Sequence, residues 1–272
     1  MTPNDPKITL ARRELVLVAV ILVVVTRLVE RPDAFLVAGL LPVVMLLAGS
    51  AVLRTDELPG RPFESLLIPA VLTGGTAAAL HLVPPGLALV PVLLAFAFGL
   101  DRILALELRL LAQATGTTDA DRARILAAAV ATAFVAFTGI AALVPGGFPE
   151  PGAADAGAAL TEGWLLVLAL DDALIALILG YRVASVRYGS SRDAIRSAVT
   201  YAIVIAVAAG ALRAMDVPRL VGPAALTLVF YLWDAIHATA PARRREARFV
   251  WETILLAALA VVVVAWNLGL RA

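Results

Sequence analysis

Three apolar segments of the chain carry an aspartate in a similar phrase of sequence. Asp101 and Asp172 are each followed by an Ile-Leu-Ala-Leu-like run, and Asp234 opens a looser copy of it. An ionised carboxylate in hydrocarbon costs several kcal/mol, so carboxylates at matching places in apolar segments need a partner or a function. The chemistry that fits is binding of a proton or a cation inside a membrane, whereas pairing with another helix is the structural alternative.

Two of these positions have a second polar residue beside them. Asp171 and Asp172 are adjacent and point about 100° apart on a helix, so they cannot chelate one ion together, but their closeness favours proton uptake. Asp234 and His237 are three apart and share a helical face, which suits a metal ligand pair or a proton relay. The alternative for His237 is an interfacial position beside Trp233.

A basic cluster near the C-terminus is the candidate site for anionic lipid headgroups, although we favour the simpler role of fixing the topology. The members are Arg243, Arg244, Arg245 and Arg248. The chain has no cysteine, which excludes disulfides, iron–sulfur clusters and thiolate nucleophiles. Zinc-protease, serine-hydrolase and P-loop motifs are missing as well, so we expect no cofactor and favour a protein that is not an enzyme.

The composition defines the class of protein that must position these groups. Hydrophobic residues make up 61% of the chain and charged residues 16%, with a mean hydropathy of +0.94. A soluble domain of this length would carry roughly 25% charged residues. We therefore predict one integral membrane domain over residues 1–272, all-α, with a short polar tail at 1–12 and a first helix that is retained rather than cleaved.

Apolar runs between charged or Pro/Gly-rich breaks predict nine transmembrane helices. Their approximate bounds are 14–29, 34–53, 65–83, 87–108, 125–144, 163–184, 194–212, 221–240 and 250–268. With the N-terminus inside, sixteen basic residues fall on the cytoplasmic side and five on the other. This excess predicts an N-in, C-out topology in a cell membrane, most simply a bacterial inner membrane.

The nine helices can be grouped as one helix and four hairpins. Under the predicted topology Asp101, Asp172 and Asp234 lie on helices that run in the same direction, each followed by a basic inner loop. A tandem duplication of a membrane hairpin would explain this pattern, and so would chance in a sequence rich in Ala and Leu.

Three functions fit these features. The first is a small proton- or cation-coupled transporter built on the intramembrane aspartates. The second is a non-catalytic subunit or scaffold of a membrane complex or homo-oligomer, in which the aspartates make interhelical pairs. The third is an intramembrane lipid-modifying enzyme that uses the inner acidic, histidine and arginine residues. The expected partners are the lipid bilayer and anionic headgroups, with no nucleic acid.

Overall fold

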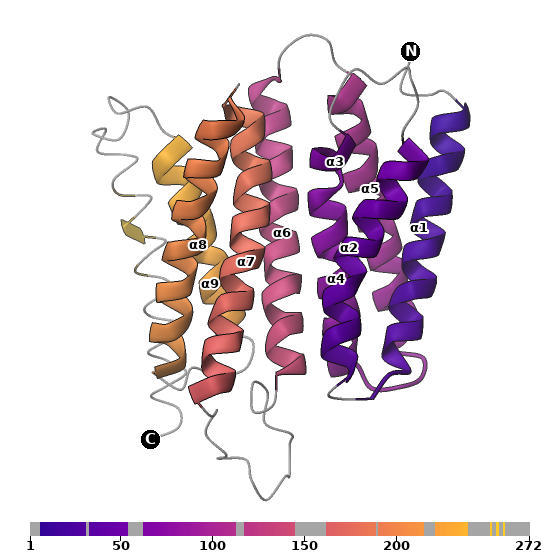
Figure 1. Cartoon of the computed structure of the whole chain (residues 1–272), viewed down its shortest axis with the longest axis horizontal. Coiled ribbons are helices and arrows are strands. Elements are labelled where there is room, and N and C mark those ends of the chain that lie inside the picture. The colour runs from indigo at the N-terminus through magenta and orange to yellow at the C-terminus, as the bar shows by residue number, and fades with distance from the viewer. Residues whose placement is uncertain are drawn as a thin grey trace, which may run out of the picture.

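The structure is a computed structural model, and its described part consists of helices and short connections. It describes residues 6–30, 33–53, 62–112, 117–144, 162–188, 190–214 and 221–238, with 251, 254, 255 and 258 near the C-terminus. Figure 1 shows the helices standing side by side, with α6 near the middle of the bundle.

The helices follow one another in a simple order along the chain. They are α1 (Pro6–Arg27), α2 (Asp33–Leu53), α3 (Pro62–Ser65), α4 (Leu67–Ala79), the 3-10 turn η1 (Leu80–Leu82), α5 (Leu89–Ala112), α6 (Asp119–Leu143), α7 (Glu162–Arg187), α8 (Ser191–Ala214) and α9 (Val221–Ala238).

Seven segments of the described chain are long and apolar enough to cross a membrane, which makes this a multi-pass membrane protein. They correspond to the second to eighth of the nine predicted spans. The first predicted span forms α1, whose Arg12, Arg13, Glu14 and Arg27 keep it outside that group of seven. The ninth, 250–268, lies almost wholly outside the described residues.

The segment Phe63–Leu82, which contains α4, is the most buried of the seven, with 78% of its apolar stretch inside the bundle. The predicted third span is broken at Leu66, so Pro69 lies in the first turn of α4, where its missing N–H would have had no helical partner. Pro91 likewise lies in the first turn of α5. Both prolines are therefore explained by where the helices begin.

Two adjacent glycines let α4 approach a helix on each side. A Cβ added at Gly74 would lie 2.6 Å from Pro42 of α2, and one at Gly75 would lie 2.7 Å from the Cα of Ala136 on α6. From the other side, a Cβ at Gly139 would lie 2.4 Å from the Gly75 carbonyl oxygen. Small residues of this kind allow helix backbones to pack closely where lipid supplies no hydrophobic drive.

The α4–α6 contact joins two apolar cores. One core is formed mainly by α1, α2, α4 and α5, and the other by α6, α7, α8 and α9 with part of α4. The end of the bundle at which α1 begins and α5 and α7 end is called the basic end below. It holds Arg12, Arg109 and Arg182, and α6 begins there on Thr118, whose hydroxyl oxygen accepts the Asp121 N–H at 3.2 Å.

Candidate functional site

Asp101 joins the first helix to the fifth. Its Oδ1 lies 2.8 Å from Nε of Arg12 on α1, and its side chain is one-third exposed. Arg102, its neighbour in sequence, instead lies over the ring of Phe98 at 4.8 Å. Helical geometry predicts that Asp101 pairs with a residue of another helix and not with Arg102, because adjacent residues do not share a helix face.

Asp234 is buried and joins three helices. Arg187 of α7 donates from Nη2 to Asp234 Oδ1 at 2.5 Å, and the hydroxyl of Tyr201 on α8 donates to the same oxygen. His237 lies one turn further along α9, with its ring 4.2 Å from that of Trp233 and its Nδ1 3.0 Å from the Trp233 carbonyl oxygen. Within the described residues Asp234 is thus the acceptor of an interhelical network.

The three matching aspartates differ in their surroundings. Asp101 is partly exposed beside α1, Asp172 is 1% exposed in α7, and Asp234 is enclosed by α7, α8 and α9. Among the described residues, no three His, Asp or Glu side chains come together in a way that could hold a metal ion. The shared phrase of sequence therefore corresponds to three separate local environments.

The strongest buried pair is one that the sequence did not single out. Arg182 of α7 donates from Nε to both carboxylate oxygens of Glu107 on α5, at 3.0 and 3.1 Å, and its Nη2 donates to Oε2 as well. Glu107 is 1% exposed and Arg182 is 7% exposed. Arg182 lies near the end of the predicted span 163–184, but α7 continues to Arg187, so Arg182 lies inside the bundle. The sequence signal that could have indicated this pair is Glu107, the one glutamate within the predicted span 87–108.

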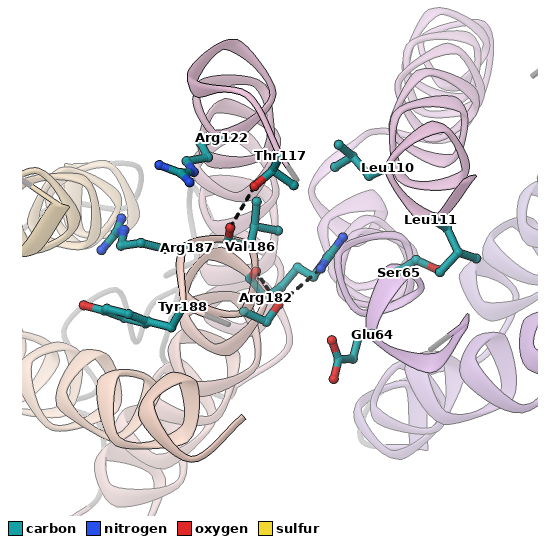
Figure 2. A pocket seen from close by; sticks show the side chains of 11 residues that line it. Glu64, Ser65, Leu110, Leu111, Thr117, Arg122, Arg182, Val186, Arg187 and Tyr188 are labelled. Carbon is teal, nitrogen blue, oxygen red and sulfur yellow. Dashed lines mark hydrogen bonds between the residues drawn. The ribbon is translucent and has the colours of Figure 1, made fainter. Parts of the chain in front are cut away.

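The basic end contains a polar cavity of about 390 Å³, here called the basic cavity. Arg122, Arg182 and Arg187 line it together with Glu64, whose Oε1 accepts the Tyr181 hydroxyl at 2.9 Å. Figure 2 shows Arg122 and Arg187 on one side of this cavity and Glu64 on the other. Thr117 closes part of the wall by donating to the Val186 carbonyl oxygen at 3.1 Å.

A second cavity, here called the apolar crevice, lies further from the basic end. It has about 280 Å³ and is formed by α2, α4, α6 and α7. Asp171 is the one titratable group among the described residues that line it. Its Oδ2 is buried and has no hydrogen-bond partner within the described part of the chain. The neighbouring Asp172 is more deeply buried and does not line the crevice.

One face of α7 lines both cavities. Asp171, Leu174, Ile175 and Ile178 line the apolar crevice, and Arg182, Ser185 and Val186 line the basic cavity. At 100° per residue these seven positions fall within about a third of the helix circumference, and Arg187, which also lines the basic cavity, lies outside that arc. One helical turn, from Ile178 to Arg182, separates the two sets, which is roughly 6 Å along the axis.

The predicted lipid headgroup site lies outside the described residues; its members are Arg243, Arg244, Arg245 and Arg248. The tertiary structure therefore places Asp171 in the lining of a cavity and Asp101 and Asp234 in ion pairs. It also adds a buried ion pair, Glu107 with Arg182, that joins two helices.

Comparison with known proteins adds no family to this description. The chain matches no protein-family model, no curated protein and no solved structure.

Proposed function

We propose that the protein is a small proton-coupled transporter whose path follows the lining face of α7. The observation that carries the proposal is the arrangement of two cavities end to end along that face, with an intramembrane carboxylate in one of them. Intramembrane carboxylates that face a cavity mark proton and ion pathways in membrane proteins. In this scheme Asp171 is the group that binds and releases the coupling proton.

The basic end faces the cytoplasm in this proposal, because basic residues concentrate on the cytoplasmic side of short loops. The chain contains no cysteine, so an introduced one is a clean probe. Ser190, which is exposed between α7 and α8, is the position to use. A membrane-impermeant maleimide should label Ser190→Cys in inverted vesicles and leave it unlabelled in intact cells; labelling in intact cells would reverse the orientation.

The passage between the cavities is closed in this conformation by one turn of α7 and its contacts. Arg182 lies at the inner side of that turn and is held to α5 by Glu107. Transport would require α5 and α7 to move relative to each other, as in other carriers that expose one site alternately to the two sides. The Glu107–Arg182 pair therefore acts as the latch between the two halves of the bundle.

The test is proton flux in proteoliposomes that contain a trapped pH indicator. A proton gradient is imposed, and Na⁺, K⁺ or tetraphenylphosphonium is added in separate runs. Wild-type protein should dissipate the gradient with at least one of these solutes, and Asp171→Asn should abolish that flux with all of them. Asp193→Asn is the matched control, because Asp193 lies on the surface of α8 with a side chain 55% exposed. A wild-type protein that moves no protons in any run would overturn the proposal.

A scaffold or subunit role is the second candidate, and the interhelical ion pairs favour it. Arg12–Asp101, Glu107–Arg182 and Arg187–Asp234 each join two different helices. Under this alternative Asp171→Asn changes no flux, and loss of the ion pairs lowers stability or the recovery of partner proteins.

A further inference from the structure

Among the described residues that line the apolar crevice, Asp171 is the one charged side chain. Besides Asp171, the described residues that line it are alanine, glycine, proline, leucine, isoleucine, valine and phenylalanine. No titratable side chain of α2, α4 or α6 faces Asp171 there. On α7 itself the neighbour is the buried Asp172, and α8 presents Tyr201 to α7 at Gly180, nine residues away. The negative charge of the Asp171 carboxylate would therefore be neutralised by a bound cation or by a proton.

An inorganic divalent cation does not suit this cavity. Ca²⁺ takes six to eight oxygen ligands and Mg²⁺ requires an octahedral set, whereas the crevice offers one carboxylate. A monovalent organic cation with an apolar body does suit it, because the walls bury the body and Asp171 neutralises the charge. Phe35 adds an aromatic ring to the lining, and aromatic faces attract cations.

The crevice is open toward the lipid between α2 and α7. Val43 of α2 and Leu174 of α7 line it and are 49% and 53% exposed. Gly39 lines it too, and a Cβ built there meets no atom within 4 Å. A lipophilic solute that has entered the membrane can therefore reach Asp171 from the hydrocarbon, and a Cβ introduced at Gly39 would meet no atom there.

We infer that the apolar crevice binds a lipophilic organic cation, with Asp171 as its counter-ion. The inference names the substrate class of the transporter proposed above and rests on that function for its role in transport. Protons and the organic cation compete for one carboxylate, so each displaces the other. This competition at Asp171 couples the two fluxes when α5 and α7 move and expose the site to each side of the membrane in turn.

Binding is tested on the purified full-length chain in detergent, without any measurement of flux. The probe is tetraphenylphosphonium, because its charge does not change with pH. Wild-type protein should bind about one molecule per chain, and Asp171→Asn should weaken binding at least tenfold while Asp171→Glu largely retains it. Binding should weaken as the pH falls, and this dependence should disappear in Asp171→Asn.

Two controls locate the site and identify the ligand class. Gly39→Leu should weaken binding although Asp171 is untouched, and Asp193→Asn should bind like wild type. Tetraphenylborate, which has the same shape and the opposite charge, should not displace the probe. Displacement by tetraphenylborate, or equal binding by Asp171→Asn, would show an apolar site for lipid chains and overturn the inference. Proton flux without probe binding would also overturn the inference that the crevice binds an organic cation, and it would leave the transporter proposal standing. Probe binding without proton flux would overturn the transporter proposal and leave the cation site standing.

Discussion

Replacing Glu107 by Gln should be among the most destabilising single changes in the described part of the chain. The substitution keeps the shape of the side chain but removes its charge, which leaves the guanidinium of Arg182 buried without a counter-ion. Both partners are under 10% exposed, and Arg182 donates to both carboxylate oxygens. Removing one partner of a buried ion pair costs about 3–5 kcal/mol, because the remaining charge stays desolvated.

The matched control is Asp119→Asn at the surface end of α6. Asp119 pairs with Arg122 at 3.3 Å, but its side chain is 98% exposed, so solvent already screens the interaction. The free energy of unfolding is measured for both variants by titration with sodium dodecyl sulfate in mixed micelles. Glu107→Gln should lower it by several kcal/mol and Asp119→Asn should leave it within experimental error.

A double variant separates the charge from the packing. Glu107→Gln combined with Arg182→Met removes both charges and keeps most of the side-chain volume, so it should recover much of the stability that Glu107→Gln loses. If Glu107→Gln costs no more than Asp119→Asn, the pair is not buried as described, and the latch between the two halves of the bundle is refuted. If the double variant is no better than the single one, the loss comes from packing.

Three further changes test other contacts by the same unfolding assay. Gly139→Ala places a Cβ 2.4 Å from the Gly75 carbonyl oxygen and should cost about 1–3 kcal/mol, whereas Gly210→Ala meets open space and should be neutral or stabilising. Tyr201→Phe removes a donor to the buried Asp234 carboxylate and should cost about 1.5–3 kcal/mol, a loss that would be absent if the hydroxyl were solvated. Asp101→Asn, at a pair whose side chains are 22% and 33% exposed, should cost under about 1 kcal/mol; a larger loss would mean that α1 depends on this contact.

The sequence alone predicted the membrane class, the helical fold and seven of the spans that the structure describes. Hydrocarbon admits helices of about 20 apolar residues and little else, so composition and run length carry that information. The break at Leu66 was harder to predict, since the hydropathy of 65–83 is continuous. The Gly74-Gly75 pair within this span is explained by the close crossing of α4 with α2 and α6.

The candidate site could be predicted only in part. The sequence shows which carboxylates need an explanation, because a charge within an apolar membrane segment is costly. They are Asp101, Asp171, Asp172 and Asp234. What each carboxylate faces depends on which helices adjoin, and local sequence does not encode that. Asp101 meets Arg12 across 89 positions, Asp234 meets Arg187 across 47, and Asp171 faces a crevice made by three other helices. Sequence thus determined which residues needed an explanation, and the packing of α2, α4, α6 and α7 decided that Asp171 lines the apolar crevice whereas Asp101 and Asp234 are held in ion pairs.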